Sequence, residues 1–102
     1  MDQDRPIGIF DSGMGGISVL SEAVRLLPNE RFIYFGDNLN APYGVLPEER
    51  IRELALHVTG RLVAQGIKAL VVACNTATSA AAQAIRQRLE IPVVAMEPAL
   101  KP

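Results

Sequence analysis

The chain has 102 residues, of which 49% are hydrophobic, and its formal net charge at pH 7 is −1. This length suits one compact domain rather than two, and the apolar fraction argues against a disordered chain. Ten Lys and Arg are offset by eleven Asp and Glu, which argues against a nucleic-acid partner, and no apolar segment approaches the roughly 20 residues of a membrane helix.

The first apolar run, IGIF at 7–10, predicts a strand, and DSGMGG follows it at 11–16. The backbone N–H groups of these glycines could bind an anion. The segment does not match the dinucleotide-binding pattern G-x-G-x-x-G, whose third glycine would fall at Ser18, and it is not a P-loop because no Gly-Lys-Ser/Thr follows. A tight turn capped by Asp11 or Ser12 is the alternative. A turn does not require Asp11 at the end of a buried strand, where the carboxylate could bind an ammonium group or steer a proton.

A helix is expected next, because Ile17, Leu20, Val24 and Leu27 recur at helical spacing before Pro28. The run FIYF at 32–35 predicts the second strand, and the polar loop GDNLNAPYG follows at 36–44. Pro42, Tyr43 and Gly44 are turn-forming residues. A loop of this length at a ligand-facing edge often contributes contacts to the ligand, so these three residues are candidates for the binding site.

The second helix is expected from Pro47, as a first-turn proline, to Gly66. Its apolar stripe comprises Ile51, Leu54, Ala55, Val58, Leu62 and Val63. His57 lies beside this stripe, and we interpret it as a helix-surface or core residue rather than a catalyst.

The third strand is expected at 69–73, and the only cysteine of the chain, Cys74, stands directly after it. A buried cysteine kept for packing is the alternative interpretation. However, a helix is expected from about Thr78 to Leu89, and its N-terminal N–H groups point back toward the sulfur, where they stabilise a thiolate. Cys74 is therefore a candidate base or nucleophile, and Asn75 and Thr76 either cap the helix or bind a carboxylate.

The fourth strand is expected at 92–95, so the order is βαβαβαβ, and the predicted fold is α/β with an open parallel sheet and flanking helices. Every strand ends in polar or flexible residues, and ligands of such sheets bind beyond the carboxyl ends of the strands. Glu97, after the last strand, is either a site carboxylate or a helix cap. The chain ends soon afterwards, so we expect part of the sheet to lack cover that further chain or a partner would supply.

This edge carries a thiol, a carboxylate, amides and backbone donors. The single His and single Cys are far from any metal-ligand spacing, so we expect no metal and no cofactor. A cofactor-free acid–base or thiol reaction on a small anionic substrate remains. One cysteine cannot form an internal disulfide, which fits a cytoplasmic protein, and the N-terminus lacks the pattern of a secretory signal.

Four blocks resemble the N-terminal half of glutamate racemase, in order and at that family's spacings: IGIFDSGMGGISVL, IYFGDNLNAPYG, VVACNTATS and IPVVAMEPALKP. The resemblance implies a partial N-terminal racemase domain over 1–102 and inversion of glutamate at Cα without a cofactor, which supplies D-glutamate for peptidoglycan. It implies that Cys74 is one of two catalytic cysteines and that Asp11 assists it. The positions that match substrate-binding residues are Ser12, Pro42, Tyr43, Gly44, Asn75 and Thr76.

The family's second cysteine lies in a second α/β half that this chain does not contain, so we expect the 102 residues alone to be inactive. The loop at 36–44 is also a loose version of the family's loop. Alternatives are a non-catalytic amino-acid-binding or regulatory half-domain and a related racemase of aspartate or a hydantoin. A homodimer that brings two copies of Cys74 together is a further alternative.

Overall fold

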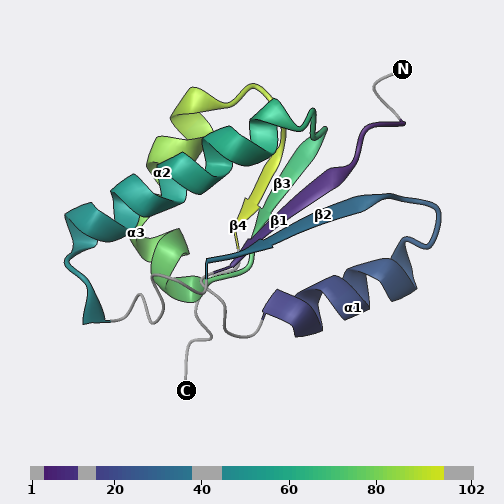
Figure 1. The fold of residues 1–102 in the computed structure, drawn as a ribbon, viewed down its shortest axis with the longest axis horizontal. Helices are drawn as coiled ribbons and strands as arrows, with labels where there is room; N and C mark the ends of the chain where they lie inside the picture. Colours follow the sequence, from purple (N-terminus) through teal and green to yellow (C-terminus); the bar gives the residue numbers. More distant parts are fainter. Residues whose placement is uncertain (1–3, 12–15, 38–44, 96–102) are drawn as a thin grey trace.

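The computed structural model describes residues 4–11, 16–37 and 45–95, apart from the side chains of 16–18 and 75–76. Within these ranges the elements follow the predicted order. They are β1 (Ile7–Asp11), α1 (Gly16–Leu26), β2 (Phe32–Gly36), α2 (Glu48–Ala64), β3 (Ala69–Val72), α3 (Asn75–Arg88) and β4 (Val93–Ala95). All the strand pairs are parallel, which confirms the predicted α/β class and open parallel sheet (Figure 1).

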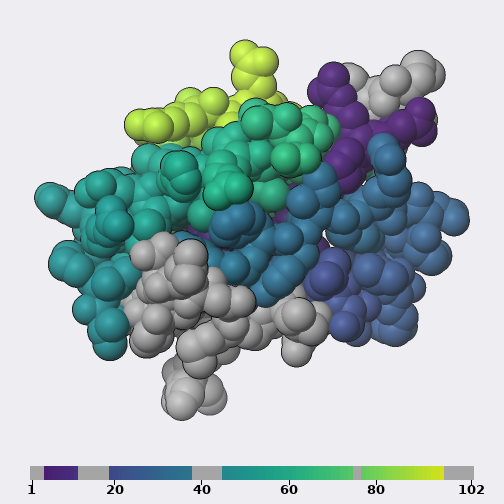
Figure 2. All heavy atoms as spheres, in the orientation of Figure 1, coloured from purple at the N-terminus to yellow at the C-terminus, as the bar shows by residue number. Residues whose placement is uncertain are grey.

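The strands are ordered β2-β1-β3-β4, so the chain changes direction within the sheet. The chain passes from β1 through α1 to β2, which lies on one side of β1. It then passes through α2 to β3, which lies on the other side of β1. Because parallel crossovers are right-handed, connections that run in opposite directions place their helices on opposite faces. Accordingly, α1 packs on β1 and β2, while α2 and α3 pack against each other on the other face (Figures 1 and 2).

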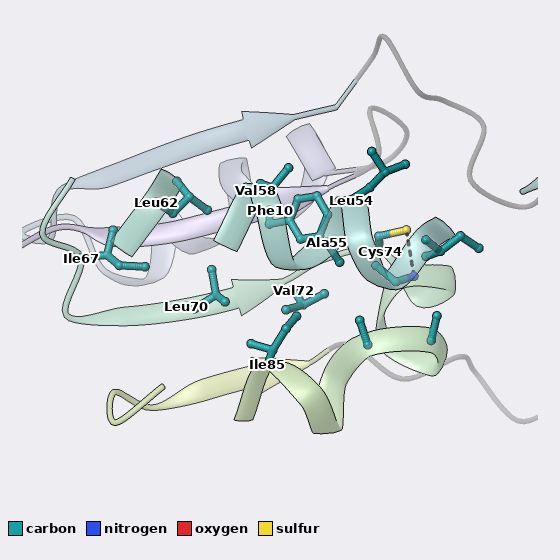
Figure 3. Close-up of a cluster of buried hydrophobic side chains, with 14 residues drawn as sticks. Phe10, Leu54, Ala55, Val58, Leu62, Ile67, Leu70, Val72, Cys74 and Ile85 are labelled. Carbon is teal, nitrogen blue, oxygen red and sulfur yellow. Dashed lines mark hydrogen bonds between the residues drawn. The ribbon is translucent and has the colours of Figure 1, made fainter. Parts of the chain in front are cut away.

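The hydrophobic core lies between the sheet and the α2–α3 layer (Figure 3). Phe10 and Val72 are register partners on β1 and β3, so their side chains leave the same face of the sheet, and both are fully buried. Burying a side chain of this size contributes about 1.5–3 kcal/mol, so this layer supplies much of the stability. The other core members from the sheet and the two helices are Leu70, Ile51, Leu54, Ala55, Val58, Leu62, Ala77, Ala80, Ala81 and Ile85.

The predicted stripe of α2 is confirmed except at its end. Val63 is 41% exposed, whereas its neighbour Leu62 is 2% exposed. Consecutive helical residues point about 100° apart, so only one of the two can face the sheet. The α2 helix also begins at Glu48, with Pro47 as the N-cap residue rather than within the first turn as predicted.

Among the residues that the structure describes, β4 is exposed on the face of the sheet that α1 covers. Val94 is 56% exposed, while Val93 and Ala95, which point to the other face, pack against the core. Val24 on α1 and Leu27, the residue directly after this helix, belong to the predicted apolar stripe, yet each is 48% exposed. Among the described residues, the expected lack of cover on part of the sheet is therefore seen at Val94 of β4.

The end of α2 gives a paired prediction about two glycines. Gly66 has φ +80°, a left-handed conformation that costs an L-residue about 1–2 kcal/mol, whereas Gly60 lies inside the helix; a Cβ at either position meets nothing within 4 Å. We therefore expect Gly66→Ala to lower the free energy of unfolding by about 1–2 kcal/mol and Gly60→Ala to raise it by about 0.5–1 kcal/mol. Urea denaturation measures both, and shifts of the same sign would contradict the helix end described here.

Candidate active site

The candidate site lies where the chain changes direction between β1 and β3. These strands are adjacent, but the chain leaves β1 toward β2 and leaves β3 toward β4. Connections that diverge from two neighbouring strands open a crevice at their carboxyl ends, which is where open α/β sheets bind ligands. Asp11 is the last residue of β1, and Cys74 joins β3 to α3, so both predicted catalytic residues flank this point.

Cys74 is the N-cap residue of α3. Its Sγ accepts a hydrogen bond from the backbone N–H of Ala77 at 3.4 Å, and its carbonyl oxygen accepts one from the N–H of Thr78 at 2.9 Å. The helix therefore begins at Asn75, three residues before the predicted start near Thr78. Asn75 and Thr76 are not its capping residues, because the sulfur takes that role.

Cys74 also belongs to the hydrophobic core, with 7% of its surface exposed. Figure 3 shows it at one end of the buried cluster, opposite the end formed by Leu62 and Ile67, with its sulfur bonded to the first turn of α3. The packing role that the sequence left as an alternative is therefore present together with the capping role. Neither role excludes chemistry, because a helix N-terminus stabilises negative charge on the sulfur that caps it.

Asp11 is fully buried at the end of the central strand β1. Its Oδ2 accepts a hydrogen bond from the hydroxyl of Tyr34 at 3.2 Å, and its backbone oxygen accepts one from the N–H of Asp37 at 2.9 Å. Burial raises the pKa of Tyr34 above the usual 10.0, and the negative charge of Asp11 and the hydrogen bond raise it further. A hydroxyl group on the neighbouring strand β2 thus contacts the carboxylate at the end of β1.

Tyr34 is a site residue that no sequence pattern above singles out. The signal for it was weak: a phenol within the apolar run FIYF, where a partly buried hydroxyl usually finds a partner. The strand register supplies what the sequence lacks, because it pairs Ile9 with Tyr34 and Asp11 with Gly36. Residues two apart on a strand share a face, so Asp11 and Tyr34 point to the same side of the sheet.

Asp11 and Cys74 leave the sheet on opposite faces. The N–H of Ala73 bonds to the oxygen of Phe10, which continues the β1–β3 pairing beyond Val72. By alternation, the side chain of Asp11 points to the α1 side and that of Cys74 to the α2–α3 side, where its core contacts lie. A molecule bound over the carboxyl edge between the two strands would meet the two groups from different sides.

The remaining predicted site residues cannot be compared in the same way. Ser12, Pro42, Tyr43, Gly44 and Glu97 lie outside the described residues, and Asn75 and Thr76 are placed only as the first two residues of α3. His57 is exposed on α2, in agreement with its interpretation as a helix-surface residue.

The described residues also bear on three other features: a metal site, a membrane-spanning helix and a second pocket. Over 4–11, 16–37 and 45–95, no three His, Cys, Asp or Glu side chains are grouped closely enough to hold a metal ion. In the same ranges no helix combines the length and apolar character needed to cross a membrane. A polar pocket of about 400 Å³ between α2 and α3 is lined by Glu48, Arg52, Gln83 and Gln87 among others, but not by Cys74 or Asp11.

Comparison with known proteins identifies similar chains. No family model matches. The glutamate racemase of Clostridium botulinum (strain Hall) is 57% identical over 99 residues, which are 97% of this chain and 38% of that protein. The glutamate racemase of Bifidobacterium adolescentis is 56% identical over 101 residues, which are 99% of this chain and 39% of that protein.

The solved structures that match this chain are also glutamate racemases. The crystal structure of glutamate racemase from Thermus thermophilus in complex with beta-chloro-D-alanine matches with a TM-score of 0.89 and 49% identity, over 93% of this chain and 37% of that one. The glutamate racemase from Francisella tularensis in complex with D-glutamate matches with a TM-score of 0.88 and 38% identity, over 93% of this chain and 36% of that one. The chain spans about 38% of its curated relatives and corresponds to their N-terminal part, which confirms the resemblance that the four sequence blocks indicate.

Proposed function

We propose that this chain is the N-terminal part of a glutamate racemase and supplies one of its two proton-transfer groups, Cys74. The observation that carries the proposal is the position of Cys74, which caps α3 at the carboxyl edge where the chain diverges from β1 and β3. The similarity to glutamate racemases over nearly the whole chain supports glutamate as the substrate, as does the D-glutamate complex of the Francisella relative.

The chemistry begins with a thiolate. Cys74 removes the proton from Cα of glutamate, the C–H bond breaks, and its electron pair remains on the carbon, next to a carboxylate. A second acid then delivers a proton to the opposite face of that carbon. This chain holds a single cysteine, and the proposal assigns the second group to the part of a glutamate racemase that lies beyond the 38% matched here.

The difficulty of this reaction lies in the charge on the intermediate. Fixed hydrogen-bond donors lower its energy most when they are already in place, because nothing then has to reorganise during the reaction. The N–H of Ala77 is a fixed donor to Sγ of Cys74, and we assign Asp11 to assist the proton transfer. In the same proposal the residues that hold the carboxylates and the ammonium group are Ser12, Pro42, Tyr43, Gly44, Asn75 and Thr76.

The proposal includes neither a metal nor an organic cofactor, since thiol and carboxylate groups account for both proton transfers. It places the protein in the cytoplasm, where a free thiol stays reduced, and assigns its product, D-glutamate, to peptidoglycan synthesis. Assembly as a homodimer stays a prediction.

A hybrid enzyme tests the proposal. This chain replaces the matching 99 residues of the Clostridium botulinum relative, and loss of the Cα hydrogen of L-glutamate in D₂O is followed by ¹H NMR. We expect the hybrid to exchange this hydrogen and to form D-glutamate, and the 102-residue chain alone to form none, because it lacks the second acid. A folded hybrid that binds glutamate without exchanging the hydrogen would instead support the alternative function, a non-catalytic amino-acid-binding half-domain.

A further inference from the structure

Tyr34 and Asp11 form a polar pair inside an otherwise apolar part of the sheet. The hydroxyl of Tyr34 donates to Oδ2 of Asp11 at 3.2 Å, and Asp11 has no exposed surface. A buried carboxylate is costly unless donors hold it, and a donor on a neighbouring strand fixes its direction as well as its charge. The hydroxyl group on β2 is therefore a contact that helps to orient the carboxylate at the end of β1.

Gly36 provides the space for this contact. It is the register partner of Asp11, and a Cβ built on it would lie 2.9 Å from the hydroxyl oxygen of Tyr34 and 3.2 Å from its Cε2. Real Cβ atoms essentially never approach another atom to 2.9 Å, so with any side chain at this position the ring of Tyr34 would have to shift. The glycine is thus needed for the close approach of the ring and not for an unusual backbone angle.

We propose that Tyr34 is a positioning residue that holds the carboxylate of Asp11 at the carboxyl edge of the sheet, in the space that Gly36 leaves open. The inference rests on the proposed function, in which Asp11 assists proton transfer at Cys74. Tyr34 itself acts through Asp11 and does not touch the substrate. Its loss should therefore slow the proton transfer more than it weakens the binding of glutamate.

The contact itself is tested in the 102-residue chain, independently of activity. The chain has two tyrosines, so a Tyr43→Phe background leaves the absorbance titration of Tyr34 alone. Asp11 raises the pKa of Tyr34 through its charge and hydrogen bond, so Asp11→Asn should lower that pKa, although burial keeps it above 10.0. Gly36→Ala should lower it in the same direction by moving the ring. An unchanged titration in both variants would overturn the proposal.

The positioning role is tested in the hybrid enzyme. We expect Tyr34→Phe to reduce kcat about tenfold, the order of one hydrogen bond to a charged group, with KM changed less than twofold. Gly36→Ala, which keeps the hydroxyl but displaces it, should give a similar loss. In a Tyr34→Phe background the added methyl group should cost little more, because the contact that it disturbs is already gone.

These outcomes separate the inference from the proposed function. If the parent hybrid exchanges the Cα hydrogen and Tyr34→Phe leaves kcat and its pH profile unchanged, Tyr34 is only structural and the proposal is wrong. If the two substitutions reduce kcat additively, they act independently and the proposal is also wrong. If the parent hybrid is folded but inactive, the proposed function fails and the catalytic role of Tyr34 fails with it, while the titration still decides whether the two side chains are in contact.

Discussion

Replacing Cys74 by serine is expected to reduce exchange of the Cα hydrogen in the hybrid enzyme by at least about a hundredfold, the usual contribution of a general base. A serine hydroxyl is far less acidic than a thiol, so almost none of it is ionised near neutral pH. Serine is nevertheless among the best N-cap residues, and its oxygen can take over the bond from Ala77 that the sulfur accepts at 3.4 Å. Activity should therefore be lost while the start of α3 is kept.

Cys74→Ala is the matched comparison. Alanine cannot accept the hydrogen bond from Ala77, so this variant should lose about 0.5–2 kcal/mol of unfolding free energy in addition to its activity. Urea denaturation of the two variants separates the capping role from the chemical role. Exchange at a near-normal rate in a folded Cys74→Ser hybrid would show that the cysteine is a packing and capping residue only.

The fold could be predicted closely because the local and global signals agree. Each strand is a continuous apolar run and was found to within one residue. The start of α3 was wrong because Asn75 and Thr76 are better caps by general preference, and only the three-dimensional position of the sulfur shows that Cys74 serves instead. The apolar stripe of α1 was found, but its partial exposure depends on what packs on it, which local periodicity does not encode.

The candidate site was predicted in part, for a related reason. Asp11 and Cys74 stand at strand ends, and a one-dimensional pattern of apolar run followed by polar residue is enough to find them. Tyr34 lies inside its strand, and its role depends on β2 lying beside β1 in one particular register. The strand order also decides that Asp11 and Cys74 flank the point of divergence, and the register of β1 and β3 decides that their side chains leave opposite faces. Contacts between strands are long-range, so no local pattern specifies them.

The second large effect is expected at Phe10, the residue before Asp11. Phe10 is fully buried on the central strand, and its side chain packs into the core between the sheet and α2 (Figure 3). We expect Phe10→Ala to lower the free energy of unfolding by about 3–5 kcal/mol, because it removes apolar contacts and leaves a cavity that the rigid sheet cannot close. Urea denaturation of the 102-residue chain measures this, with Leu26→Ala as the control, since Leu26 is 61% exposed and its loss should change stability by less than about 0.5 kcal/mol.

The size of this loss matters because domains of about 100 residues are stable by only about 5–15 kcal/mol. A chain with an open sheet face at β4 and a half-exposed α1 has less buried surface to draw on, so Phe10→Ala should leave a large part of the population unfolded at 37 °C. In the hybrid enzyme, further chain is present and the same substitution should be better tolerated. An equal midpoint shift in both proteins would mean that the remaining sequence adds nothing to this core, whereas a smaller shift in the hybrid would mean that it packs on the surfaces left open here.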